Sequence, residues 1–81
     1  MAQHSQLLSR VIDVLADFPT PELVMQLHAN DKEEARLEEL ALRNEAGLLS
    51  FDEKIELEHY RVAEHMVRMA KARAYRRLMN A

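Results

Sequence analysis

The chain has 81 residues, of which 48% are hydrophobic and 31% charged, with one glycine and two prolines. A chain of this length forms one domain, and its composition is typical of a folded, helix-rich protein, which excludes disordered and fibrous classes. The absence of cysteine excludes disulfides, thiolate zinc sites, iron–sulfur clusters and cysteine nucleophiles, and it fits a reducing compartment.

The net charge of -3 is distributed unevenly along the chain. Residues 31–58 contain ten acidic and four basic residues, whereas residues 59–81 contain one acidic and six basic residues. We therefore expect an acidic middle segment followed by a basic C-terminal segment.

The first predicted element is an amphipathic helix over about residues 4–17. Apolar residues recur every three or four positions from Leu7 to Phe18, which is the periodicity of a helix with one wide apolar face. Proline disfavours the helical conformation of the residue before it, so the helix is expected to end at Phe18, ahead of Pro19.

The next two predicted helices cover residues 21–28 and 31–46. Thr20 can cap the shorter of them, because its hydroxyl can accept a backbone hydrogen bond and a proline follows at the first helical position. Asn30 or Asp31 can cap the longer one in the same way.

Gly47 and Ser50 mark the turn into the last helix. Gly47 lies where a left-handed residue commonly ends a helix, and Ser50 with Glu53 forms a capping-box pattern. No helix breaker follows, so the last helix is predicted over about residues 51–80. At 1.5 Å per residue it is roughly 45 Å long, against about 24 Å for the helix before it.

These elements predict an all-α fold in a single domain over residues 1–81. The last two helices form an antiparallel hairpin, and the long C-terminal helix extends beyond its hairpin partner. The two N-terminal helices must cover part of the remaining length. The sequence leaves open whether the first helix packs within its own chain or on another copy.

The long helix carries two apolar stripes, about 140° apart at 100° per residue. We expect the first stripe to face the preceding helix, and it consists of Phe51, Ile55, Val62, Met66 and Met69. We expect the second stripe to face the first helix or another copy, which makes it the predicted partner interface, and it consists of Tyr60, Ala63, Val67, Ala70, Ala74 and Leu78.

The N-terminal segment, residues 1–18, has no basic leader region, and its apolar residues are interrupted by Arg10, Asp13 and Asp17. Nowhere does an apolar run approach the ~20 residues that a membrane helix needs. We therefore expect a cytoplasmic protein with no membrane partner.

Motifs for catalysis are missing from the sequence. The serines lack the glycine context of a nucleophile elbow, and a single glycine cannot form a phosphate-binding loop. We expect no enzymatic activity and no cofactor.

Glu56 and His59 form a Glu-x-x-His pair, which is half of the motif that binds metals in carboxylate di-metal helical bundles. Two copies in a dimer would double the pair, with Glu38 or Glu45 as further carboxylates. A metal-binding helical dimer is therefore one alternative, and a hydrogen-bonded polar pair at the mouth of the hairpin is the other.

The end of the last helix is basic, and its positive residues are Arg68, Lys71, Arg73, Arg76 and Arg77. Such a cluster can bind nucleic acid or an acidic protein surface. The five residues are spread around the helix instead of forming one stripe, and cations also stabilise the negative end of a helix.

Five short motifs follow one another along the second and later helices. They are a Pro-Glu start, an acidic Leu-Glu-Glu-Leu step, a Gly-x-Leu-Ser-x-x-Glu turn, a Glu-Leu-Glu-x-Tyr step and a Lys-Ala-Arg-Ala end, at Pro21–Glu22, Leu37–Leu40, Gly47–Glu53, Glu56–Tyr60 and Lys71–Ala74. In these motifs the chain resembles a group of small bacterial helical proteins of unknown activity, some of them encoded near nuclease genes.

This chain departs from the group by its first helix and by Phe51 and Asp52, where such proteins tend to have proline and glutamate. The resemblance implies a partner-binding or antitoxin-like role. From the residues themselves we expect a non-enzymatic protein–protein interaction module, a homodimer formed through the long helix. The alternatives are a regulator that binds nucleic acid with its basic end and the metal-binding dimer.

Overall fold

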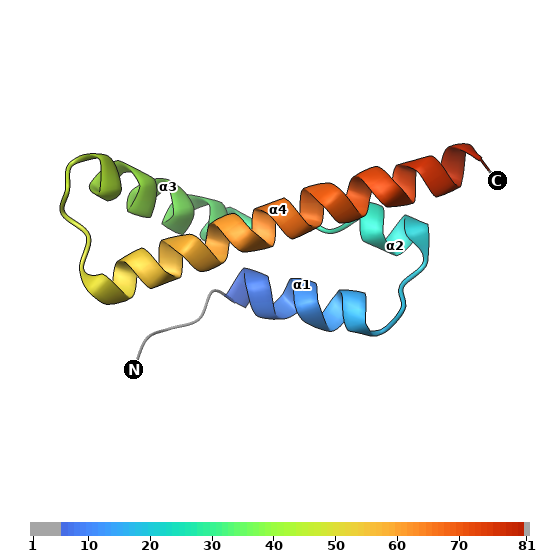
Figure 1. Cartoon of the computed structure of the whole chain (residues 1–81), viewed down its shortest axis with the longest axis horizontal. Coiled ribbons are helices and arrows are strands. Elements are labelled where there is room, and N and C mark those ends of the chain that lie inside the picture. The colour runs from blue at the N-terminus through green and yellow to red at the C-terminus, as the bar shows by residue number, and fades with distance from the viewer. Residues whose placement is uncertain (1–5, 81) are drawn as a thin grey trace.

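The computed structural model describes residues 6–80, and four helices and no strand are present there (Figure 1). The helices are α1 (Gln6–Ala16), α2 (Pro21–Met25), α3 (Asp31–Glu45) and α4 (Phe51–Met79). The predicted all-α fold with a long C-terminal helix is confirmed. Residues 4 and 5, placed in the first helix by the sequence, lie outside the described residues.

The α2 helix is shorter than predicted because its last turn tightens. The backbone N–H of Gln26 donates to the Leu23 carbonyl at 3.1 Å, and that of Leu27 donates to the Val24 carbonyl at 3.0 Å. These bonds span three residues instead of four, which is a common way for a helix to end.

Side-chain caps begin the three later helices. The Thr20 hydroxyl accepts from the Leu23 N–H at 3.3 Å, as predicted. Asn30, and not Asp31, caps α3 in a complete capping box with Glu33, in which both hydrogen bonds measure 2.8 Å. The predicted Ser50–Glu53 box begins α4. Each cap satisfies backbone donors that would otherwise lack partners.

The turn between α3 and α4 depends on Gly47, whose φ of +71° lies in the left-handed region predicted for it. The Gly47 N–H donates to the Asn44 carbonyl at 3.0 Å, and the Leu48 N–H donates to the Arg43 carbonyl at 2.9 Å. This pair of hydrogen bonds is the Schellman motif, and it ends α3 so that the chain can reverse direction.

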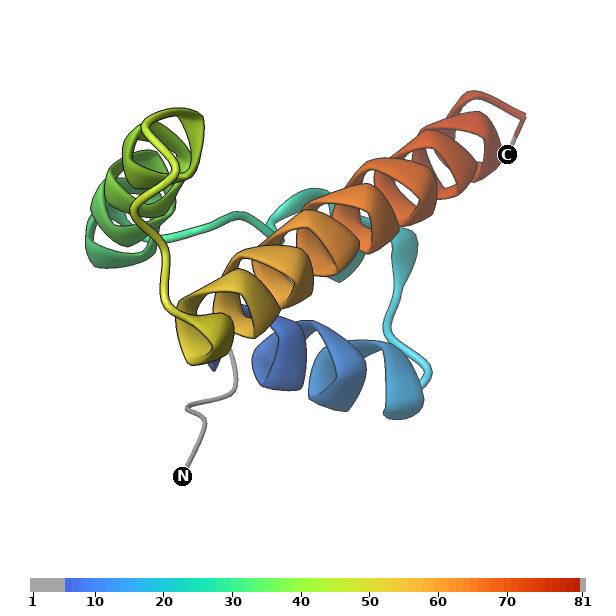
Figure 2. The same ribbon diagram turned by 60° about the vertical axis from the view of Figure 1, so that its left-hand side comes forward.

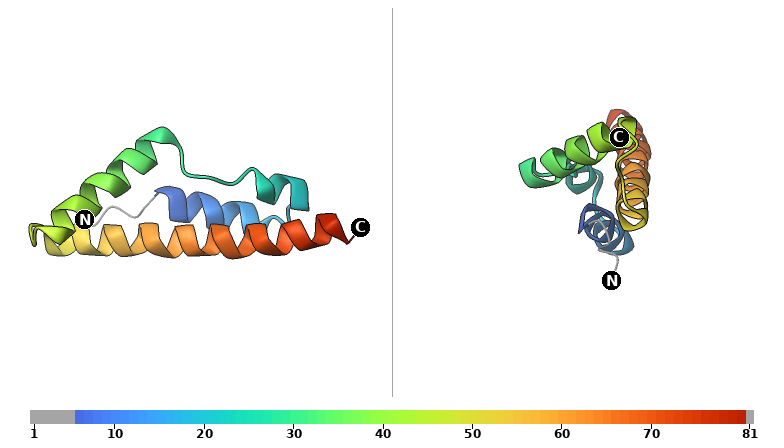
Figure 3. Two further views of the ribbon diagram at one scale, coloured as in Figure 1. Left: turned by 90° about the horizontal axis from the view of Figure 1, so that it is seen from above. Right: turned by 90° about the vertical axis from the view of Figure 1, so that its left-hand side faces the viewer.

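The α4 helix contacts each of the other three helices and spans the long axis of the molecule (Figures 1 and 2). α3 is closest to α4 at the turn and separates from it toward the other end, while α1 lies along the middle of α4 (Figure 3). α2 packs on the C-terminal half of α4. The hairpin is therefore an open V, and α1 packs beside it against α4, in one core group with Leu40 of α3.

Two groups of buried side chains form the core. The larger group joins α1, α3 and α4, and consists of Leu7, Val11, Leu40, Leu57, Tyr60 and Ala63. The smaller group joins α2 and its C-terminal extension to α4, and consists of Val24, Leu27 and Ala74. The first helix thus packs within its own chain.

The expectation that the first apolar stripe faces the preceding helix was wrong. Phe51 is 77% exposed, Met69 45% and Val62 39%. The α4 residues in the core group with Leu40 of α3 are Leu57, Tyr60 and Ala63, which lie about 100–160° around the helix from Val62. Because α3 diverges from α4 and touches that other side, the first stripe faces outward.

The core assignment predicts the response of the protein to truncation at Leu40, which is fully buried. A Leu40→Ala variant should lose about 2–5 kcal/mol of unfolding free energy, because it loses buried contacts and leaves a cavity. Urea denaturation followed by circular dichroism measures the change. Leu42→Ala is the matched control, since Leu42 on the same helix is 60% exposed, and equal losses in both variants would contradict this core.

Candidate interaction surface

The structure places the predicted partner interface mostly inside the chain. Tyr60, Ala63 and Ala74 are at most 5% exposed, because α1 and α2 cover them. Of the two alternatives for this stripe, contact with the first helix is the one observed for Tyr60 and Ala63, and the assignment of the buried residues to a partner interface was wrong. Val67 and Ala70 are half-buried against the core, and Leu78, 39% exposed, is the one member of the six that stays largely accessible. Burial also raises the pKa of the Tyr60 hydroxyl.

The first stripe is part of the exposed apolar surface of α4, and Tyr75, Leu78 and Met79 are also exposed near the end of the helix. We call this stripe the outer stripe and define it as Phe51, Ile55, Val62, Met66 and Met69. Phe51, Val62 and Met69 are exposed and the other two are half-buried. The stripe extends over about 27 Å of helix. Exposed apolar side chains gathered on one face of a helix are a common mark of protein–protein contacts.

A groove lies beside the C-terminal half of this stripe, between α4 and the corner that joins α1 to α2. We call it the corner groove; its volume is about 770 Å³ and its lining includes Leu15, Phe18, Pro19, Met66, Met69, Arg73 and Arg77. Phe18 is 93% exposed and has a φ of +51°. This left-handed conformation costs a bulky residue about 1–2 kcal/mol.

The predicted basic residues are only partly brought together. Arg73, Arg76 and Arg77 border one hollow at the end of α4, together with Asn80. Arg68 is exposed and Lys71 half-buried, and both lie nearer the middle of the helix. Cations here also stabilise the C-terminal end of the helix dipole.

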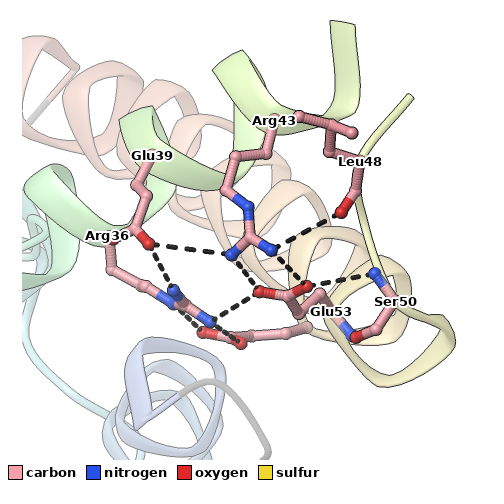
Figure 4. Close-up of polar contacts among 7 residues, drawn as sticks. Arg36, Glu39, Arg43, Leu48, Ser50 and Glu53 are labelled. Carbon is pink, nitrogen blue, oxygen red and sulfur yellow. Dashed lines mark hydrogen bonds and ion pairs between the residues drawn. The ribbon is translucent and has the colours of Figure 1, made fainter. Parts of the chain in front are cut away.

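The candidate metal ligand Glu56 is occupied by an arginine from α3 (Figure 4). Arg36 donates from Nε to Glu56 Oε2 and from Nη2 to Glu56 Oε1, both at 2.8 Å. Glu38 and Glu45, the two further carboxylates named with this pair, are exposed on α3. The two hydrogen bonds to Glu56 raise the pKa of Arg36. They favour the second alternative for Glu56, a polar contact at the mouth of the hairpin.

No side-chain cluster suited to a metal ion is present in residues 6–80, where no three His, Cys, Asp or Glu residues come together. His59, the second member of the predicted pair, is half-buried on α4. Within the same residues, no helix is both long enough and apolar enough to cross a membrane.

A second arginine, Arg43, continues the polar contact between α3 and α4 (Figure 4). It pairs with the Glu53 carboxylate, and its Nη2 lies 3.0 Å from Glu53 Oε1. Glu53 also accepts from the Ser50 N–H at 3.0 Å in the capping box. The Ser50 backbone lowers the pKa of Glu53 most, and the Ser50 hydroxyl and Arg43 lower it further.

Two features of the structure were not predicted from the sequence. Arg10 of α1 pairs with the buried Glu33 and donates to the His28 carbonyl at 3.2 Å, which ties α1 to the start of α3. The Asn30-x-x-Glu33 spacing could have indicated a structural role for the Glu33 carboxylate, since this spacing is a capping-box pattern. The strained backbone of Phe18 has no comparable sequence signal, because glycine and asparagine are the residues expected there.

Comparison with known protein families, with curated proteins and with solved structures finds no match for this chain. The resemblance to small bacterial helical proteins therefore stays a prediction.

Acid titration should show the contribution of Glu53 to stability. Its pKa is lower in the folded chain than its ordinary value of 4.5, so its charge stabilises the fold above that pH and the effect is lost as the pH falls through the folded pKa. Glu53→Gln keeps a capping acceptor but removes the charge. It should lower the urea midpoint at neutral pH, and the difference from wild type should shrink below about pH 4.5.

The exposed Glu64 on the same helix offers a matched control, as Glu64→Gln should leave the urea midpoint nearly unchanged throughout. A gap between wild type and Glu53→Gln that stays constant with pH would contradict the role of the charge.

Proposed function

We propose that this protein is a non-enzymatic interaction module that self-associates through the outer stripe of α4. The observation that carries the proposal is that Phe51, Val62 and Met69 remain exposed although three helices already pack on α4. A helix of 29 residues is longer than any of its neighbours, so it offers a long free face to another copy. Small helical domains often gain stability by forming such symmetric contacts.

The charges of α4 favour an antiparallel arrangement of two copies. The last acidic residue of the helix is Glu64, and five basic residues follow it. Two parallel helices would bring the basic ends together, whereas two antiparallel helices place each basic end beside the acidic half of the other.

A specific register follows if the two-fold axis passes between His65 and Met66. Val62 of one copy then lies opposite Met69 of the other, and Glu58 lies opposite Arg73. The apolar pairs are at the centre and the charged pairs flank them, which is the usual anatomy of an interface. The contact is isologous, so it closes on itself and yields a dimer.

Single charge insertions test the interface. Val62→Glu and Met69→Glu should each raise the dimer dissociation constant by about tenfold or more, because a carboxylate would be buried among apolar side chains. Both residues are exposed in the single chain, so its fold should persist. Sedimentation equilibrium measures the association, and circular dichroism checks the helix content. Leu42→Glu on the exposed surface of α3 is the control and should self-associate like wild type.

A charge swap tests the register. Glu58→Arg and Arg73→Glu should each weaken the dimer, and the double variant should restore it, because it re-forms the pair with reversed signs. A wild-type chain that stays monomeric at submillimolar concentration would refute self-association. A dimer that tolerates both charge insertions would place the contact elsewhere.

A further inference from the structure

The corner groove has an apolar base, an aromatic and proline wall, and a basic edge. Leu15, Val24 and Ala70 contribute to the base, together with the two methionines that it shares with the outer stripe. Phe18 and Pro19 form the wall on the corner between α1 and α2. Arg73 and Arg77 line the same groove from α4. Methionine side chains are flexible and polarisable, so such a base can adapt to different apolar partners.

The backbone of Phe18 ends α1 in the left-handed conformation, and its N–H donates to the Leu15 carbonyl at 3.4 Å. The exposed phenyl ring has no such role in the isolated chain. Phe18 is 93% exposed, so it buries almost no apolar surface, and its φ of +51° is a conformation that favours glycine. The two observations coincide at the wall of the groove. A strained residue with an exposed aromatic ring is typical of binding sites, where a ligand covers the ring.

We propose that the corner groove binds an acidic amphipathic helix of another protein. The charge of the groove selects this occupant, because the residues that line it include two arginines and no acidic residue. An apolar face of the partner would lie on the methionines and against Phe18, and its carboxylates would reach Arg73 and Arg77. Arginine pairs well with carboxylates because its planar donors match their two oxygens.

The length of the groove sets the length of the partner. Its lining on α4 runs from Met66 to Arg77, which is about 16 Å of helix, or three turns. A partner helix of about three turns fits this distance, with apolar residues at the i, i+3 or i+4, and i+7 positions. The apolar base favours such a helix over nucleic acid, whose phosphates would meet the arginines but leave the methionines uncovered.

Binding in the groove and self-association should compete. Met66 and Met69 belong to both surfaces, so one α4 helix cannot offer them to a second copy and to a partner helix at once. Phe18 and Arg77, in contrast, lie outside the outer stripe. Variants at these two positions therefore report on the groove alone.

A displayed library of helical peptides tests the proposal. The peptides are about three turns long, with apolar residues at helical spacing and a random choice of Glu, Lys or Ser elsewhere. Selection on the full chain, after depletion on a chain that carries both Phe18→Ala and Arg77→Glu, should enrich peptides rich in Glu. An enriched peptide is then labelled, and its affinity is measured by fluorescence anisotropy.

Matched variants identify the surface that binds this peptide. Phe18→Ala and Arg77→Glu should each weaken binding by about tenfold or more, whereas Phe51→Ala and Arg61→Glu should not. Phe18→Gly should also weaken binding and should fold at least as stably as wild type, because glycine relieves the strained backbone. Val62→Glu should abolish self-association yet keep the peptide bound, so the two proposals can fail separately.

Three results would overturn the proposal. The library could enrich no peptide over the depleted background, or it could enrich peptides rich in Lys. The third is that a mixed-sequence DNA or RNA duplex displaces the peptide, and that Phe18→Ala leaves the affinity of the chain for this duplex unchanged. That result would assign the basic edge to nucleic acid.

Discussion

The contact between α1 and the middle of α4 determines the rest of this structure. Leu7 and Val11 of α1 are almost fully buried in one group with Tyr60, Ala63 and Leu40. Ala63 is small, so α1 can approach α4 closely, and the buried apolar area stabilises the open hairpin that α3 and α4 form. Without α1, the same side chains of α3 and α4 would be exposed to water. The ion pair of Arg10 with Glu33 adds a polar tie between α1 and the cap of α3.

The position of α1 also decides which surface of α4 is left for partners. Because α1 and α2 cover the side with Tyr60, Ala63 and Ala74, the outer stripe faces solvent. The α1–α2 corner then creates the groove beside that stripe, with Phe18 at its wall. The arginines of α3 act on the other side of the helix, where Arg36 and Arg43 pair with Glu56 and Glu53 and fix the angle of the hairpin at the turn. Packing and partner surfaces are thus two consequences of one arrangement.

Local signals in the sequence predicted the helices well, and long-range packing was predicted less well. Thr20, Ser50 and Gly47 act through neighbours within five residues, so their roles could be derived from spacing alone. The two stripes of α4 were also recognised, but their partners were assigned on the assumption that α3 runs along α4. The divergence of α3 from α4 is a feature of long-range packing, which no local pattern encodes. The contact of Arg36 with Glu56 could not be derived for the same reason, since the two residues are twenty positions apart in sequence.

The most direct test of this account is an isotope-filtered nuclear Overhauser experiment on a mixture of labelled and unlabelled chains. It separates contacts within a chain from contacts between chains. The account predicts that the Val11 methyl groups contact the Tyr60 ring only within a chain, because α1 packs on its own α4. Contacts between Val11 and Tyr60 that arise between chains, or no contact between them at all, would contradict it, because Tyr60 and Ala63 would then belong to an interface.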